Sequence, residues 1–306
     1  SLTGIVMKEY LFNSNTFTKL KWIVPPYNRS GNFVPLYDSI NNKITAHYAS
    51  GGHKTNNNEW DCAPANYNLE IVSFDFGKTW SEPTIIKNLG KYYGLQPGPG
   101  NSAVTIQHNK THIDYYFAAH YLTAYRQHGG VVIYKSNDNG LNYNPIKFYP
   151  KMDEPSITII NNTYLYLNMR TNYGFRGIAW SNDSGLTWSE NFLDQTLIDP
   201  KCEGGLSAYK DYLLFTNPVM KYSRSNLTLF FKHYKASRWN TIQIADPSIL
   251  TDYSVIVQNP IIINHTKYIG VIWGSCKIPF PFRPWCMYGW EIKISYIPLY
   301  KINICN

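Results

Sequence analysis

The sequence predicts an all-β protein, a six-bladed β-propeller with repeated hairpin turns. One pattern, Ser-x-Asp-x-Gly-x-Thr-Trp, occurs in full at residues 73–80 and 181–188 and, ending in Asn and Tyr, at residues 136–143. No stretch shows helical periodicity of any length, so little helix is expected. The length of 306 residues suits six four-stranded blades of about 40–50 residues each. Six such blades leave no room for a second domain, so residues 1–306 are predicted to form a single propeller domain.

The repeated pattern is typical of a tight turn between two strands. Each copy follows a run of β-branched or aromatic residues, at 69–72, 131–134 and 177–180. In such a turn the Asp accepts backbone N–H groups, the Gly supplies a positive φ and the final aromatic ring packs beneath. Asp75, Asp138 and Asp183 are therefore predicted to be hairpin residues and not catalysts. A weaker fourth copy near Lys235–Trp239 keeps only the aromatic end.

The segments between these turns are mostly strand-like. The first 35 residues contain short strand-like pieces and a Pro25-Pro26 turn, and Gly51–Trp60 is a polar loop too long for a hairpin. Loops of that kind often carry function on a rigid scaffold. Tyr164–Arg170 alternates as a strand, whereas the Pro-rich segment Lys277–Trp285 cannot be a central strand.

Composition excludes some classes of partner. The net charge of +8 comes from dispersed Lys and Arg residues, whereas a nucleic-acid-binding protein would concentrate its charge in a patch or stripe. A basic surface can still attract anionic glycans. The 26 Tyr, 9 Trp and 14 Phe residues suit strands and core, and their ring faces would also suit a carbohydrate site.

Cysteine and asparagine usage points to a secreted or cell-surface protein. Six glycosylation sequons are present, at Asn28, Asn109, Asn161, Asn182, Asn226 and Asn264. The five cysteines form no CxxC pair and no zinc-binding spacing with His. In oxidising surroundings Cys276 and Cys286 could close a small loop, although all five could also be free. No apolar run is long enough to span a membrane and no signal peptide is visible, although the chain begins at a Ser and a leader could have been removed.

Several segments resemble the sialidase (neuraminidase) family, in the order in which that family has them. The repeated turns match its Asp-boxes, which recur in unrelated folds and alone indicate only a fold. Asp153–Ile159 and Tyr164–Arg170 resemble the stretch that holds the general-base Glu and one arginine of a carboxylate-binding triad. The resemblance therefore assigns Glu154 and Arg170 to these roles.

Two later segments extend this resemblance, which spans roughly residues 30 to 275. Leu214–Pro218 with Ser223–Leu229 resembles the segment of the next triad arginine, which corresponds to Arg224, and Asp252–Val255 places the nucleophile at Tyr253. The resemblance implies a retaining exo-sialidase in which Glu154 activates the Tyr253 phenol and arginines hold the sugar carboxylate. It implies sialylated glycans or glycoproteins as partners, and no cofactor or metal.

Three departures from the family pattern put full activity in doubt. Phe33 stands where the first triad arginine belongs, with Arg29 four residues upstream. Gly274 stands where the Glu that pairs with that arginine belongs. The acid/base Asp does not align, and Asp61, on an inserted loop, is the nearest carboxylate. His53, in the same loop, is expected to be solvated.

Two functions are therefore open from the sequence. One is an exo-sialidase of weak or altered activity, which would explain why the Tyr253–Glu154 pair is present. The other is a catalytically inactive sialoglycan-binding lectin on a sialidase fold, which would explain the lost arginine, glutamate and acid. Nothing specific favours a third function, a propeller that binds other proteins, and the sequence gives no oligomeric state.

Overall fold

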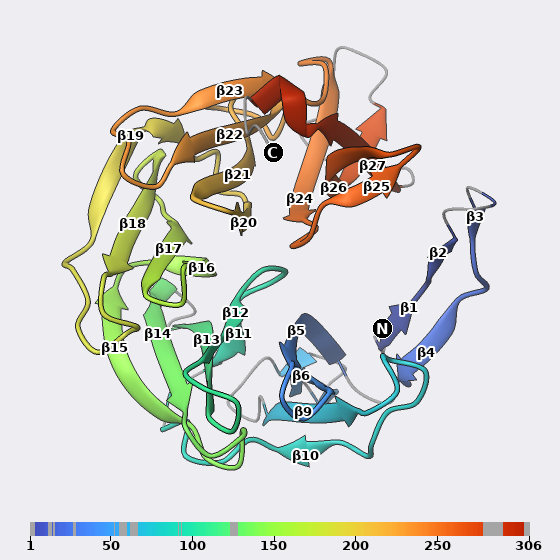
Figure 1. The fold of residues 1–306 in the computed structure, drawn as a ribbon, viewed down its shortest axis with the longest axis vertical. Helices are drawn as coiled ribbons and strands as arrows, with labels where there is room; N and C mark the ends of the chain where they lie inside the picture. Colours follow the sequence, from blue (N-terminus) through green and yellow to red (C-terminus); the bar gives the residue numbers. More distant parts are fainter. Residues whose placement is uncertain are drawn as a thin grey trace.

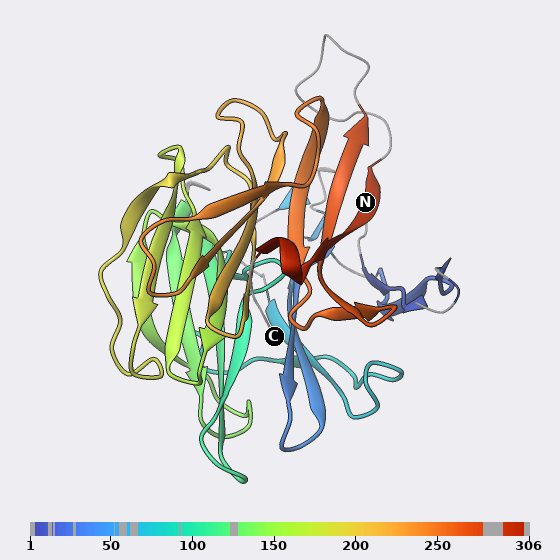
Figure 2. The same cartoon turned by 45° about the horizontal axis from the view of Figure 1, so that its top comes forward.

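Five antiparallel sheets of four or more strands stand around a common axis in the computed structural model (Figure 1). The structure describes residues 4–11, 14, 16–26, 29–51, 53–54, 60–61, 67–90, 92, 94–122, 128–277 and 290–302. Figure 2, turned by 45°, shows these sheets as separate blades standing side by side around the axis. The prediction of an all-β propeller is confirmed.

The first two blades occupy the N-terminal half of the ring. The first contains β5 (Arg29–Asp38), β6 (Lys43–Gly51), β9 (Tyr67–Ser73) and β10 (Thr84–Ile85). The second contains β11 (Gln96–Pro97), β12 (Ala103–Gln107), β13 (Ile113–Leu122), β14 (His128–Ser136) and β15 (Asn144–Pro150).

The other three blades follow in chain order. The third contains β16 (Asp153–Ile160), β17 (Tyr164–Arg170), β18 (Phe175–Ser181) and β19 (Phe192–Ile198). The fourth contains β20 (Gly205–Tyr209), β21 (Tyr212–Pro218), β22 (Leu227–His233) and β23 (Asn240–Gln243). The fifth contains β24 (Ile249–Ile256), β25 (Ile261–Ile263), β26 (Thr266–Lys277) and β27 (Glu291–Pro298), and the 3₁₀ helix η1 (Leu299–Ile302) follows it.

The predicted number of blades, six, is one more than the described residues form. The N-terminal segment makes only two-stranded ladders, in which β1 (Ile5–Met7) pairs with β4 (Lys21–Val24) and β2 (Tyr10–Leu11) pairs with β3 (Thr16–Phe17). Strands of two to four residues bury too little apolar surface to build a four-stranded blade. A third short ladder joins β7 (His53–Lys54) to β8 (Trp60–Asp61).

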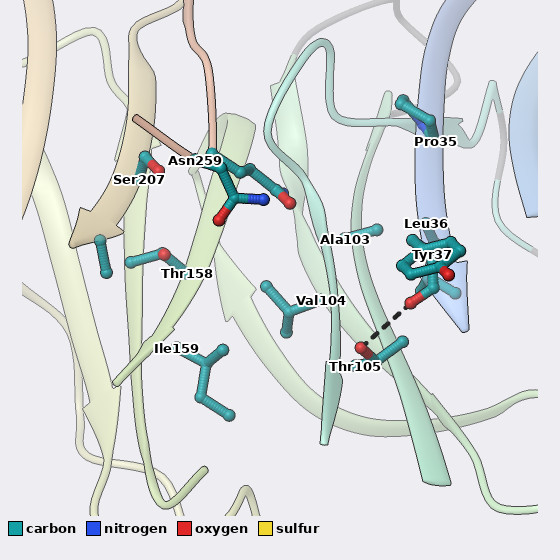
Figure 3. A pocket seen from close by; sticks show the side chains of 12 residues that line it. Pro35, Leu36, Tyr37, Ala103, Val104, Thr105, Thr158, Ile159, Ser207 and Asn259 are labelled. Atoms are coloured by element: carbon teal, nitrogen blue, oxygen red, sulfur yellow. Dashed lines mark hydrogen bonds between the residues drawn. The ribbon is translucent and has the colours of Figure 1, made fainter. Parts of the chain in front are cut away.

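The hydrophobic core lies between neighbouring blades and not on the axis. One cluster packs β12–β15 against the third blade through Ile106, Tyr116 and Leu165, and another packs the third blade against the fourth through Ile178 and Phe215. The innermost strands instead line an axial cavity of about 260 Å³ (Figure 3). There Thr105 Oγ1 donates a 3.2 Å hydrogen bond to the Tyr37 carbonyl, which links the first two blades.

The repeated turns have the hydrogen bonds that their sequence predicts. In the copy at residues 181–188, the Asp183 carboxylate accepts the Thr187 backbone N–H at 2.9 Å, and Ser181 Oγ accepts the Gly185 N–H at 2.8 Å. Gly185 has a φ of 81°, a conformation that glycine adopts without strain. Each copy joins the last two strands of its blade, β9 to β10, β14 to β15 and β18 to β19, at the same end as the preceding hairpin turn, which joins β5 to β6, β12 to β13 or β16 to β17.

Two further predictions meet the structure only in part. Cys202 is a buried free thiol and Cys276 is disulfide-bonded, but its partner lies outside the described residues, so pairing with Cys286 stays a prediction. In the described part of the chain, no helix has the length and apolar character needed to cross a membrane.

Candidate active site

Glu154 is presented by a β-bulge at the start of β16. Asp153 pairs with Arg170 and Pro155 pairs with Met169, so Glu154 is an extra residue between two regular pairs. Its φ is positive, at 22°, which is uncommon for a residue with a side chain. Bulges of this kind re-aim a side chain and are frequent beside active sites. Here the Glu154 carboxyl group contacts Arg170, at the end of β17, and Tyr253, on β24.

Tyr253 is presented in the same way by β24. The pairing of β24 with β26 shifts between Thr251 and Ser254, which leaves Asp252 and Tyr253 in the irregular part of the strand. The Tyr253 hydroxyl donates a short hydrogen bond to Glu154 Oε1. The bond joins residues 99 positions apart in the chain, and it brings the predicted nucleophile and its predicted base into direct contact.

Arg170, at the end of β17, holds the other oxygen of the same carboxylate. Its Nη1 donates to Glu154 Oε2 at 2.5 Å, and its Nε lies 3.7 Å from Asp153 Oδ2. Only 15% of the Arg170 side chain and 11% of the Glu154 side chain are exposed, so little water screens this pair. Tyr253, Glu154 and Arg170 therefore form one continuous hydrogen-bonded chain.

Arg224 completes the group from the fourth blade. Its guanidinium carbon lies 5.7 Å from the centre of the Tyr253 ring. Its Nη1 donates to Asp252 Oδ1 and its Nη2 to the Lys201 carbonyl, both at 2.6 Å. Burial acts to lower the pKa of Arg224, but nearby groups that include Asp252 and Tyr253 raise it overall, against the opposing charge of Arg170.

A cavity of about 430 Å³ opens beside these groups. Both arginines line it, and Asp252 and Lys201 add one charge of each sign. Tyr222 and Trp290, which are 90% and 46% exposed, also line it. The remaining lining residues are Pro200, Ser223, Leu250 and Thr251. The arrangement suits an anionic ligand with an apolar face, since aromatic rings can stack on sugar C–H surfaces.

The Tyr253 phenol is held in its protonated form. Burial raises its pKa well above the ordinary value, and the charge of Glu154 and the hydrogen bond to it raise it further. Arg170 acts in the opposite direction without reversing the effect. A phenol in this setting becomes a nucleophile only as its proton moves to the carboxylate that already accepts it.

Two of the three departures, Phe33 and Gly274, lie in different parts of the structure. Phe33 is partly buried against the Val24, Tyr48 and Ile71 cluster, and its ring meets Trp80 edge-on at 6.1 Å. Gly274 lies beside two residues that line the cavity, since an added Cβ would be 3.4 Å from Asp252 Cβ and 3.6 Å from the Trp290 ring. The side chains of Asp61 and His53, and that of Arg29, lie outside what the structure describes, so their predicted roles stay predictions.

Glu203 is a buried acid beneath the site that the sequence did not single out. It is fully buried, its Oε1 accepts a 3.5 Å hydrogen bond from Ser156 Oγ, and its carboxyl group accepts one from the Ser254 backbone N–H. Burial raises its pKa, and the charge of Glu154 raises it further. Glu203 therefore links the strands that carry Glu154 and Tyr253. Nothing in the sequence marked this acid as buried.

Comparison with protein families finds one match. The family described as BNR repeat-like domain matches residues 16–264, most of the chain. No curated protein sequence gives a significant match.

Solved structures of sialidases share this fold. A Hadza microbial sialidase gives a TM-score of 0.73 at 21% identity, over 94% of this chain and 57% of that one. The NanB sialidase from Streptococcus pneumoniae gives 0.66 at 14%, over 85% and 58%. The Trypanosoma rangeli sialidase, solved with 2,3-difluorosialic acid as a covalent intermediate, gives 0.67 at 17%, over 90% and 48%. The chain spans about half to three fifths of these proteins, and at such identities the likeness establishes the fold.

Proposed function

The chain belongs to the BNR repeat-like domain family and has the sialidase fold, and from this premise we propose that it recognises sialic acid as an exo-sialidase-type glycoside hydrolase of weak or altered activity. The observation that carries the proposal is the hydrogen-bonded chain from Tyr253 through Glu154 to Arg170, with Arg224 beside the Tyr253 ring. These groups come from three different blades, and the two arginines among them line one cavity.

The proposed reaction retains the anomeric configuration. Tyr253 Oη attacks the anomeric carbon, its proton passes to Glu154, and the bond to the leaving-group oxygen breaks. That oxygen takes a proton from an acid, for which Asp61 is the candidate. Water then attacks the anomeric carbon, its proton goes to the acid residue, and the phenolate oxygen leaves and recovers its proton from Glu154. The uncharged phenol suits this substrate because a carboxylate nucleophile would be repelled by the sugar's own carboxylate.

Binding of the substrate carboxylate is expected to be weaker than binding by a complete arginine triad. Phe33 packs into an apolar cluster, and Arg224 is already paired with Asp252, which must compete with the substrate carboxylate. Loss of one charged contact of this kind costs about 2–5 kcal/mol. At about 1.36 kcal/mol for each tenfold change, this corresponds to a rate roughly 30- to 5,000-fold lower.

The same observations support an alternative, a sialoglycan-binding lectin without useful turnover. An Arg224–Asp252 pair and a Gly at position 274 are compatible with ligand binding but not with a complete catalytic set. The paired Tyr253 and Glu154 argue against it, because a lectin needs no nucleophile with its base in contact.

Hydrolysis of an activated aryl α-sialoside separates the two functions. An enzyme cleaves it, and Tyr253→Phe lowers the rate by about a thousandfold or more because the nucleophilic oxygen is removed. Tyr300→Phe, at an exposed residue in η1, removes the same group elsewhere and should leave the rate unchanged. No turnover with binding that Arg224→Ala abolishes would select the lectin. Neither turnover nor binding to sialylated glycans would contradict both functions.

The wider setting of the protein is also a proposal. The three repeated turns are assigned as Asp-boxes, and residues 1–306 as one propeller domain. Six sequons and a disulfide-bonded Cys276 support a glycosylated, secreted or cell-surface protein. Sialylated glycans or glycoproteins are the proposed partners, and neither a cofactor nor a metal is required for this reaction.

A further inference from the structure

Two histidines face each other across the turn that joins β12 to β13. The His108 backbone N–H donates to the His112 carbonyl at 2.9 Å, which makes the two residues neighbours at the end of the ladder. Asn109 Oδ1 accepts the backbone N–H groups of Thr111 and His112 at 2.8 and 2.9 Å, and so fixes the turn. Asp114, two residues after His112, lies on the same face because side chains alternate along a strand.

The three side chains converge on one point. Asp114 Oδ2 lies 2.8 Å from His108 Nε2, and Asp114 Oδ1 lies 2.9 Å from His112 Nε2. The ring centres are 4.9 Å apart, and one ligand atom from each residue lies within 4.8 Å of the others. Asp114 is only 3% exposed, whereas the His108 and His112 side chains are 39% and 48% exposed. A rigid buried oxygen donor therefore lies beneath two rings that solvent can reach.

Lys135 on β14 forms an ion pair with one oxygen of the Asp114 carboxylate. Its Nζ lies 2.8 Å from Asp114 Oδ2, and 5.4 Å from the centre of the Tyr116 ring. The lysine contact is therefore on Oδ2, whereas Oδ1 is the oxygen that contacts His112.

We propose that His108, His112 and Asp114 bind a divalent transition-metal ion such as Zn²⁺. Two imidazole nitrogens and a carboxylate oxygen form a ligand set that zinc accepts, with water in the fourth position. The ion replaces the two hydrogen bonds, each exposed ring turning until its Nε2 lies about 2.0–2.1 Å from the metal. Lys135 contacts Asp114 Oδ2 and so orients the carboxylate, but the lysine charge repels the metal ion and limits the affinity of the site for it.

This site is separate from the candidate active site. The β12–β13 turn is at the end of its blade that carries the turn at residues 136–143, whereas Glu154 and Arg170 lie at the opposite end of the third blade, away from its own repeated turn. No sequence signal predicted this site, because the spacing of His108, His112 and Asp114 is not a recognised zinc-binding pattern. The proposal therefore stands or falls independently of the sialidase function.

Calorimetric titration of the full chain with ZnCl₂ tests the proposal. The unmodified protein should take up one ion saturably at this site, and His108→Gln and His112→Gln should each weaken binding by at least about tenfold. His265→Asn changes an exposed histidine at a positive φ that Asn tolerates, and should leave binding unchanged. Lys135→Met should tighten binding, because a repelling charge is removed while Asp114 stays.

Two results would overturn the assignment. One is the absence of saturable Zn²⁺ uptake by the unmodified protein. The other is uptake that persists undiminished in the double variant His108→Gln/His112→Gln, which would place the ion elsewhere. A circular dichroism spectrum checks that each variant is folded, and the exposure of both rings makes folding of these variants the expected result.

Discussion

Individual residues at the centre of this propeller break the rules of regular strands where the chemistry is proposed. Glu154 has a positive φ in a bulge, and Tyr253 lies in a second irregular stretch that faces it. Such strain typically costs about 1–3 kcal/mol and persists only where the surroundings enforce it. Pro155 and the Glu203 carboxyl group, which joins the two strands, are part of those surroundings.

The buried acid Glu203 should make the protein less stable as pH rises. Its pKa is raised in the folded state, so the folded chain holds a proton that the unfolded chain releases above its ordinary value of about 4.3. The contribution of this group to the free energy of unfolding is fully present below that pH and is lost as pH rises towards the folded-state pKa. Glu203→Gln keeps the shape without the titration, so its stability relative to the unmodified protein should increase between pH 4 and pH 8.

Urea denaturation at several pH values measures this difference. Glu190→Gln is the matched control, since the Glu190 side chain is 90% exposed and should show no such trend. A Glu203→Gln variant whose relative stability falls or stays constant over this range would show that Glu203 is ionised in the folded protein.

At the scale of single elements, the repeated turns are where sequence and structure agree most closely. The pattern specifies its own hydrogen bonds within eight residues, so no distant contact is needed to predict it. Gly185 shows how tightly the turn is packed, because an added Cβ would lie 2.9 Å from Tyr116 Cε1 and 3.1 Å from Leu165 Cδ1. The turn therefore also closes the interface between the second and third blades.

Replacing this glycine should be more costly than replacing a glycine with the same backbone in open space. Gly185→Ala meets both a strained φ of 81° and the Tyr116 ring, whereas Gly174→Ala meets only a φ of 82° with no atom within 4 Å. Strain alone is worth about 1–2 kcal/mol of unfolding free energy, and overpacking adds about 1–3 kcal/mol. Denaturant unfolding measures both variants, and equal losses would mean that Gly185 is not packed as described.

Whole-molecule properties were predictable from the sequence only where a local signal existed. The propeller was predicted from the repeated turns. The described residues form no sixth blade because the N-terminal strands are too short, and no repeated pattern in that segment indicates how long its strands are. Glu154, Arg170, Arg224 and Tyr253 were found through family resemblance, since residues 99 positions apart give no local sign of contact. Glu203, the Arg224–Asp252 pair and the histidine cluster depend on tertiary packing, and no sequence pattern marked them.

The central claim is that two arginines, a tyrosine and a glutamate from three blades form one site for an acidic sugar. A crystal structure with the 2,3-didehydro analogue of sialic acid tests it most directly. The predicted result is a carboxylate held between the guanidinium groups of Arg170 and Arg224, with the anomeric carbon facing Tyr253 Oη. An analogue bound elsewhere, or one whose carboxylate touches neither arginine, would contradict the account.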